Sequence, residues 1–317
     1  WLQPPTAVVK RPPRFVFASL KGGVGRSTAI SVVAAEAARS GRNVLVVDLD
    51  LEAPGVGAIL LTPDRLPELG TLDYLVARNF GPYRGAVDAL VGTSPLTAGS
   101  GLVDVSPVAG SSSLRHPQNV LGKIARGSIE GEGEDGTPLT LTDKIASLLS
   151  ELEARRSYDL VLVDARAGLA ELTAGPILGL GAHVLLFGTA QRQTFEGYRY
   201  LFAHLATLVG EGQPSPWGRL KMVHAKAGTV DSMRRYRDEF WELFATYLYE
   251  EQEGLEEFNS GPDYPEAAHY PLVTLNDLAF ADWDPSEDAS KLDAKYYERT
   301  FGDLISFVND QCQRSLA

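Results

Sequence analysis

A glycine-rich stretch near the N-terminus combines the residue types that bind phosphate. It has the sequence KGGVGRST over residues 21–28 and follows a short apolar run, Phe15–Ala18. Its three glycines allow backbone N–H groups to turn inward around phosphate oxygens at the start of a helix. A glycine-rich turn without a ligand is the alternative, but the early Lys21 and the hydroxyl pair Ser27–Thr28 favour a phosphate-binding loop.

Acidic residues follow two other apolar runs of the chain. Asp48 and Asp50 come at the end of the run Val44–Val47, and Asp164 directly follows Leu160–Val163. Carboxylates at the carboxyl ends of parallel strands point toward the crevice in which ligands bind, where they can hold metal and water. Aspartates in such turns also cap the following backbone, so a purely structural role for Asp48 and Asp50 is the alternative.

The position of these residues depends on a sheet of short strands. Runs this short and rich in Val and Leu, with helical stretches between them, are typical of parallel strands that crossover helices bury on both faces. The sequence therefore predicts a doubly wound α/β fold, with a mostly parallel sheet flanked by helices. A helix over Ser27–Ser40 would place its N-terminus against the glycine-rich loop. The six runs are Phe15–Ala18, Val44–Val47, Leu102–Val105, Leu160–Val163, Val184–Phe187 and Leu220–Val223.

The glycine-rich loop resembles the deviant Walker A motif of the ParA/MinD family of P-loop ATPases (SIMIBI class), which is written KGGxGK[ST]. Arg26 stands where that motif has its P-loop lysine, and its guanidinium is wider, planar and permanently charged. The resemblance implies a P-loop NTPase fold that binds ATP and Mg²⁺. It implies that Lys21 crosses a dimer interface to the partner's phosphates and that Ser27 binds Mg²⁺. The implied nucleotide-binding residues in this loop are Lys21, Gly22, Gly23, Val24, Gly25, Arg26, Ser27 and Thr28.

The acidic residues fit the same resemblance. The family's D-x-D supplies one aspartate to the magnesium shell and another to the attacking water, which implies Asp48 for the metal and Asp50 for the water. Leu160–Val163 followed by Asp164 has the form of a Walker B, so Asp164 is expected beside Mg²⁺. The continuation DARAGLAE resembles the MinD-like DSPAG segment, which makes Gly168 the candidate sensor of the γ-phosphate and the last nucleotide-binding residue. The implied catalytic residues are Asp50, Lys21 and Arg26.

The organisation of the chain favours one large domain. Its 317 residues are 44% hydrophobic, enough for a sizeable core. We predict a proline-rich linker over residues 1–13 and a ParA/MinD-like nucleotide-binding domain over residues 14–317, with insertions near 127–136 and 232–257. The aromatic and acidic side chains of the second insertion suit either a partner-binding helix or, as the favoured alternative, a helix packed on its own domain.

Composition excludes several kinds of protein. The single Cys312 rules out an internal disulfide framework and the thiolate ligands that an iron–sulfur carrier needs. The five histidines have no close metal-ligand spacing. A net charge of −12 disfavours broad adhesion to DNA or to an anionic membrane. No apolar run is long enough to span a bilayer. With a single cysteine in the chain, a reducing cytoplasm is the natural setting.

Two functions survive these constraints. The first is a slow Mg·ATP-dependent switch that dimerises with a second copy of itself, presents a composite surface to a protein partner and resets on hydrolysis. The second is a non-hydrolysing, nucleotide-bound scaffold or regulatory module of a larger protein, in which Arg26 holds phosphate without assisting transfer. Non-specific DNA is a disfavoured partner and direct membrane binding is not expected. The family's Asn after the sixth strand is missing from Met222–Lys226, so adenine as the base rests on the resemblance alone.

Overall fold

The computed structural model of the protein describes residues 1–53, 55–96, 101–133, 136–209, 215–249, 261–281, 283, 285, 290 and 293–315. The strands are β1 (Arg14–Ser19), β2 (Asn43–Leu49), β3 (Gly92–Thr93), β4 (Leu102–Ser106), β5 (Gly131–Glu132), β6 (Pro138–Leu139), β7 (Leu160–Ala167), β8 (His183–Gly188), β9 (Leu220–Ala227) and β10 (Leu272–Leu275). The α-helices are α1 (Arg26–Arg39), α2 (Val56–Leu60), α3 (Thr71–Ala77), α4 (Ser111–Arg115), α5 (Val120–Gly127), α6 (Leu141–Ala154), α7 (Glu171–Ala174), α8 (Arg192–Ala206), α9 (Val230–Tyr247) and α10 (Ala294–Arg314).

One large sheet organises the molecule, with strand order β10–β9–β8–β1–β7–β2–β4–β3. Its neighbouring strands are parallel except for the short edge pair β3–β4, which is antiparallel. All six apolar runs of the sequence are strands of this sheet, so the predicted doubly wound α/β fold is confirmed. The two edge strands β3 and β10 were not predicted, since both are short and lie in segments with many turn residues.

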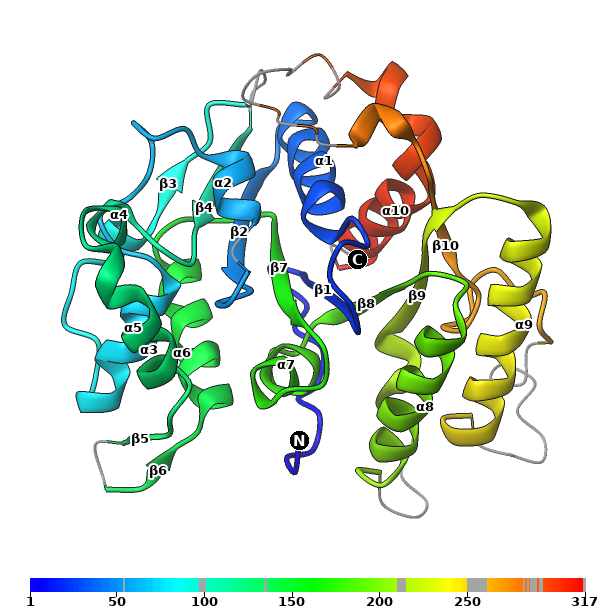
Figure 1. Ribbon diagram of the computed structural model, residues 1–317, viewed down its shortest axis with the longest axis horizontal. Coiled ribbons are helices and arrows are strands. Elements are labelled where there is room, and N and C mark those ends of the chain that lie inside the picture. Colours follow the sequence, from blue (N-terminus) through cyan, green and yellow to red (C-terminus); the bar gives the residue numbers. More distant parts are fainter. Residues whose placement is uncertain are drawn as a thin grey trace.

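Helices cover the sheet on both faces (Figure 1). One face packs against α1, α2 and α10, and its apolar cluster includes Val32, Val46 and Leu304. The other face packs against α3, α6, α8 and α9, and its apolar cluster includes Val47 and Leu148. Successive residues of β2 thus point into different clusters, which is the two-residue period of a strand buried on both sides.

The centre of the sheet determines where a ligand can bind. β7 lies between β1 and β2 and runs parallel to both. Asp164 of β7 therefore has Phe17 of β1 on one side and Asp48 of β2 on the other. The loop that follows β1, the loop that follows β2 and the end of β7 meet at one edge of the sheet, although they are far apart in the sequence.

The two predicted insertions lie at the periphery. Residues 127–133 include the end of α5 and strand β5, which pairs with β6 in a separate hairpin, whereas residues 134–135 lie outside the described residues. The second insertion begins inside α9, where Phe240 and Phe244 are buried and contact Phe202 of α8. The favoured alternative, a helix packed on its own domain, is therefore confirmed for this part; residues 250–257 are not described. Within the described ranges, no helix has the length and apolar content needed to cross a bilayer.

Candidate functional site

The glycine-rich loop joins β1 to α1 and exposes its backbone to a ligand. Gly23 (φ 74°) and Gly25 (φ 87°) adopt left-handed conformations that a residue with a Cβ reaches only at a cost. A Cβ added at either glycine would meet no atom within 4 Å, so the space in front of the loop is open. Gly25 is the N-cap of α1 and has no side chain that could cap the N–H groups of the helix. The first N–H groups of a helix have no intrahelical partner, and they favour an anion here.

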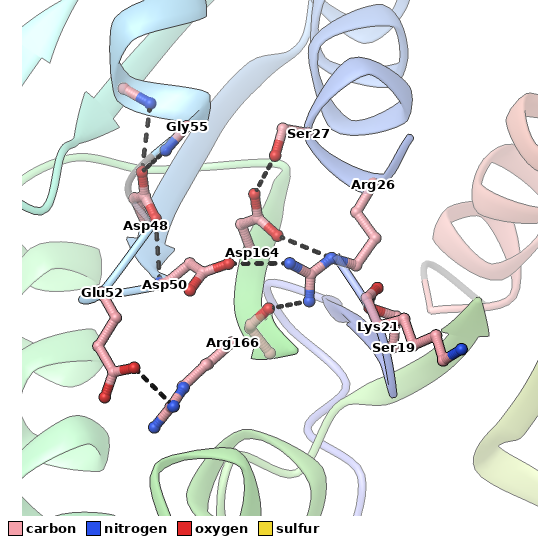
Figure 2. Close-up of polar contacts among 12 residues, drawn as sticks. Ser19, Lys21, Arg26, Ser27, Asp48, Asp50, Glu52, Gly55, Asp164 and Arg166 are labelled. Atoms are coloured by element: carbon pink, nitrogen blue, oxygen red, sulfur yellow. Dashed lines mark hydrogen bonds and ion pairs between the residues drawn. The ribbon is translucent and has the colours of Figure 1, made fainter. Parts of the chain in front are cut away.

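Ser27 and Asp164 are in direct contact where α1 begins. The Ser27 hydroxyl donates a hydrogen bond to Oδ2 of Asp164 at 2.7 Å, as Figure 2 shows. Asp164 is 1% exposed, and its Oδ1 has no hydrogen-bond partner among the described residues. A buried carboxylate oxygen that accepts no hydrogen bond is costly, so it favours a positive charge nearby, either a metal ion or the Arg26 guanidinium at 3.7 Å.

Asp48 is held by the backbone of the loop that follows it. Its Oδ1 accepts a hydrogen bond from the N–H of Asp50 at 3.1 Å, and its Oδ2 accepts from the N–H groups of Gly55 and Gly57, both at 3.3 Å. Burial, together with the nearby charge of Asp164, raises the pKa of Asp48 above the usual range of a carboxyl. Asp48 thus caps this turn, as the structural alternative predicted, and its role as a metal ligand stays a prediction.

Arg26 points into the carboxylate cluster. Its Nη2 lies 2.9 Å from Oδ2 of Asp50, and its Nε lies 3.7 Å from Oδ1 of Asp164. Its Nη1 donates a short hydrogen bond to the carbonyl of Ala165. The Arg26 side chain is only 6% exposed, and these two carboxylates are its charge partners. Burial raises the pKa of Asp50, and the charge of Arg26 opposes that rise.

A β-bulge shapes the end of β7. Phe17 of β1 pairs with Asp164, but Ser19 pairs with Ala167, so two residues of β7 stand opposite one residue of β1. The extra residue lies at Ala165–Arg166, where the chain leaves the regular ladder. Bulges re-aim side chains and carbonyl groups, and they are frequent beside active sites. This one presents the Ala165 carbonyl to the P-loop.

Gly168 lies directly after β7 and beside the end of β1. Its N–H, which the family resemblance assigns to the γ-phosphate, donates a hydrogen bond to the carbonyl of Ser19 at 2.8 Å. The Ser19 hydroxyl donates in turn to the carbonyl of Lys21 at 2.7 Å. Gly168 is therefore linked to the glycine-rich loop, and its N–H has to leave Ser19 before it can contact a phosphate.

A cavity of about 410 Å³ continues from the glycine-rich loop toward the edge strand β10. Its size is typical of small-molecule sites. Lys226 lines it at the end of β9 and has φ 52°, the only positive φ of a residue other than glycine in the described part of the chain. Such a conformation costs free energy in a residue with a Cβ and is frequent at functional sites. The cavity is lined by residues 23–28, Lys226, Thr274, Leu275, Asn276, Asp277, Leu278, Phe280, Ala281, Thr300 and Phe301.

The sequence did not indicate the far wall of this cavity. Residues 274–281 comprise the end of β10 and the segment after it, and they contain no motif that marks them as functional. The available signal was the apolar stretch Leu272–Leu275 between Pro271 and the turn residues Asn276 and Asp277, which is the pattern of a short strand followed by a turn.

The side chains beside the phosphate loop fit a magnesium ion that takes most of its ligands from phosphate oxygens and water. No group of three or more His, Cys, Asp or Glu side chains that could hold a metal occurs within the residues that the structure covers. Mg²⁺ is usually bound by one or two carboxylates together with phosphate oxygens and water. The Ser27 hydroxyl and Oδ1 of Asp164, which accepts no hydrogen bond from the described residues, satisfy that requirement beside the phosphate loop.

Several solved structures have the same architecture as this chain. No protein-family model and no curated protein matches the sequence. Similar structures include pNOB8 ParA bound to non-specific DNA, with a TM-score of 0.57 and 16% identity over 96% of this chain and 98% of that one. The MinD cell-division ATPase of Pyrococcus furiosus has a TM-score of 0.56 and 18% identity over 94% and 99% of the two chains. The septum site-determining protein MinD of Pyrococcus horikoshii OT3, complexed with Mg-ADP, has a TM-score of 0.57 and 16% identity over 96% and 98%.

This chain has the ParA/MinD fold. The predicted P-loop NTPase architecture is thereby confirmed over nearly the whole length of this chain and of each similar structure. The identities are too low to transfer activity, so the roles of individual site residues stay predictions.

The structure brings most of the predicted site residues together. Ser27, Asp50 and Asp164 contact one another directly or through Arg26. Lys21 lies apart from this cluster, with its side chain exposed at the beginning of the loop. The sequence did not indicate Glu52 and Arg166, whose side chains form an ion pair of 2.6 Å at the rim of the site.

Proposed function

We propose that this protein is a nucleotide-dependent switch of the ParA/MinD type that binds ATP and Mg²⁺. The observation that carries the proposal is the contact between Ser27 and Asp164 beside an open phosphate loop that continues into a 410 Å³ cavity. An anion-binding helix N-terminus, a hydroxyl–carboxylate pair and a cavity of nucleoside size are the three parts that a Mg·nucleotide site needs.

Each part of the site has a separate task in this proposal. The backbone of Gly22–Thr28 binds the phosphates, and the cavity that extends to β10 takes the nucleoside. Ser27 and Asp164 hold Mg²⁺, which neutralises charge on the phosphate oxygens when it is bound. Asp50 orients the attacking water once its carboxylate is released from Arg26. Adenine is proposed on the family resemblance.

Dimerisation and a protein partner belong to the same proposal. Lys21 is exposed at the mouth of the loop, where it is available to a second copy of the chain. We propose a homodimer that forms when nucleotide is bound and that presents a composite surface to a protein partner. Among similar structures, one of MinD from Aquifex aeolicus is a complex with MinC. The ParA structure is bound to non-specific DNA, but the net charge of −12 opposes that partner for this chain.

A second function is favoured by the buried Arg26–Asp50 ion pair. A guanidinium that is 2.9 Å from Asp50 and almost fully buried keeps the carboxylate away from a water molecule. If this pair persists with nucleotide bound, the protein is a non-hydrolysing, nucleotide-bound scaffold. Asp50 and Asp164 would then serve to hold Arg26 and the metal.

Turnover, nucleotide binding and sizing together distinguish the two functions. We expect wild type to bind Mg·ATP, to shift to a dimer and to release phosphate slowly, with Asp50→Ala abolishing release but not binding. Nucleotide binding without turnover, together with turnover restored by Arg26→Lys, would support the scaffold. Absence of binding to ATP and ADP by wild type would reject both functions.

A further inference from the structure

A second arginine stands at the rim of the site and has no role in the family resemblance. Arg166 lies two residues after Asp164 and pairs with Glu52 at 2.6 Å. The Arg166 side chain is 28% exposed and that of Glu52 is 50% exposed. Exposed pairs of this kind contribute little to stability, so a structural role alone gives a weak account of the contact.

Arg166 lies in the bulge of β7. Ala165 and Arg166 stand opposite one residue of β1, so the regular ladder with β1 is interrupted there. On the other side of β7, pairing with β2 ends at Leu49, opposite Ala165. Arg166 and the loop that carries Glu52 therefore both begin where the sheet ends, at the ligand edge.

Two arginines hold that loop from different elements. Arg26 comes from the glycine-rich loop and binds Asp50, whereas Arg166 comes from β7 and binds Glu52 (Figure 2). The positive charge of Arg166 also acts on Asp50, whose pKa it lowers against the effect of burial. Asp50, which pairs with Arg26 of the glycine-rich loop, is therefore also within the electrostatic reach of Arg166.

A terminal phosphate is a better partner for Arg166 than Glu52 is. Guanidinium groups bind phosphate through two parallel hydrogen bonds, and a dianionic phosphate attracts them more strongly than a single carboxylate does. Glu52 is half exposed and lies on a loop, so its carboxylate can move to water at little cost. The cavity lies on the β10 side of the glycine-rich loop, and β7 and β2 lie on its other side. With the nucleoside in that cavity, the last phosphate of a triphosphate would extend toward β7 and β2, and a diphosphate lacks it.

We propose that Arg166 is a further phosphate-binding residue of this site, whose guanidinium exchanges Glu52 for the terminal phosphate of a nucleoside triphosphate. The proposal rests on the nucleotide-binding function proposed above and names the residue that distinguishes a triphosphate from a diphosphate. Arg166 is a binding residue in this scheme. Glu52 is a positioning residue, because it acts only through Arg166.

Calorimetric titration with Mg·ATPγS and with Mg·ADP tests this assignment on the full chain. Loss of a charge-assisted contact to phosphate is expected to weaken ATPγS binding about tenfold in Arg166→Gln, with ADP binding unchanged. Arg166→Lys should retain part of the preference, since it keeps the charge and loses the paired geometry. Glu52→Gln should tighten ATPγS binding about two- to fivefold and leave ADP unchanged, because it removes the competing carboxylate.

Glu196→Gln is the matched control for Glu52→Gln. It removes one partner of the exposed Arg192–Glu196 pair on α8, of 2.7 Å, and should change neither affinity. The ADP affinity of each variant reports whether its site is intact, so a folding defect is recognised directly. An unchanged ratio of ATPγS to ADP affinity in Arg166→Gln overturns the assignment while leaving the proposed function in place. Failure of wild type to bind either nucleotide overturns both.

Discussion

Removal of the Arg26 guanidinium should destabilise the empty protein in a pH-dependent way. Arg26→Met keeps much of the side-chain length but removes the ion pairs of Asp50 and Asp164, so that Arg166 is the positive charge left near Asp50. At an effective dielectric constant of about 20, one charge pair 4 Å apart is worth about 4 kcal/mol before desolvation. Removing one partner of a buried pair costs about 3–5 kcal/mol, because the other charge stays buried. For a chain of 317 residues that corresponds to a fall in Tm of about 5–8 °C.

The pH dependence follows from the carboxyl groups. Burial raises the pKa of Asp50 and Asp164 already in the presence of Arg26, and removing the guanidinium raises both further. A folded-state pKa above the unfolded value destabilises the protein at high pH, and the effect disappears as the pH falls and the carboxyl takes up a proton. The loss in Arg26→Met should therefore be largest near pH 8 and smaller near pH 5.5.

Thermal unfolding followed by circular dichroism at both pH values measures this effect. EDTA is present throughout, so that no metal ion replaces the guanidinium. Arg192→Met is the control, because Arg192 is 86% exposed in its pair with Glu196 and its loss should shift Tm by about 2 °C or less. A Tm of Arg26→Met within about 2 °C of wild type at pH 8, or an equal loss at both pH values, would falsify the view that Arg26 neutralises the cluster.

Three further predictions concern the loop, the metal ligands and acid stability. Ser27→Ala should weaken Mg·ATP binding at least tenfold in titration calorimetry and affect metal-free ATP less, whereas Ser31→Ala, one turn along the same helix, should change neither. Gly25→Ala, at φ 87°, should lower the free energy of unfolding by about 1 kcal/mol, while Gly122→Ala in α5, where a Cβ meets nothing within 4 Å, should leave it equal or higher. Burial lowers the pKa of His224 to about 4, so this residue costs stability progressively as the pH falls from 6.5 toward 4. His224→Phe, which keeps an aromatic ring against Tyr236, should remove up to about 3 kcal/mol of the acid-induced loss, and an unchanged pH profile would contradict this account.

The fold was accessible from the sequence because its signals are local. Six short Val- and Leu-rich runs predicted buried parallel strands, and each is a strand of the sheet. The helix predicted over Ser27–Ser40 is α1 to within one residue at each end. A strand buried on both faces and a helix that begins at a glycine-rich loop are determined by neighbouring residues, so no tertiary information was needed.

The sequence predicts which residues form the candidate site, but it does not predict the contacts that those residues make. The sequence places Ser27, Asp48 and Asp164 at the ends of elements that a parallel sheet brings to one edge. It leaves open that Asp48 caps the following turn, but it does not show that the donors are the N–H groups of Gly55 and Gly57. Such contacts depend on the path of a loop, which composition does not specify.

Arg26 and Arg166 show most clearly what the tertiary structure decided. From the sequence, Arg26 was expected at the phosphates, and Arg166 was one charged residue in a segment after a strand. In the folded chain, Arg26 pairs with two buried carboxylates, and Arg166, in the bulge of β7, pairs with Glu52. The sequence determined that this chain has the elements and residue types of a phosphate site. Which charge pairs with which was decided by the tertiary structure, because electrostatic pairing depends on distances that exist only after the sheet has formed.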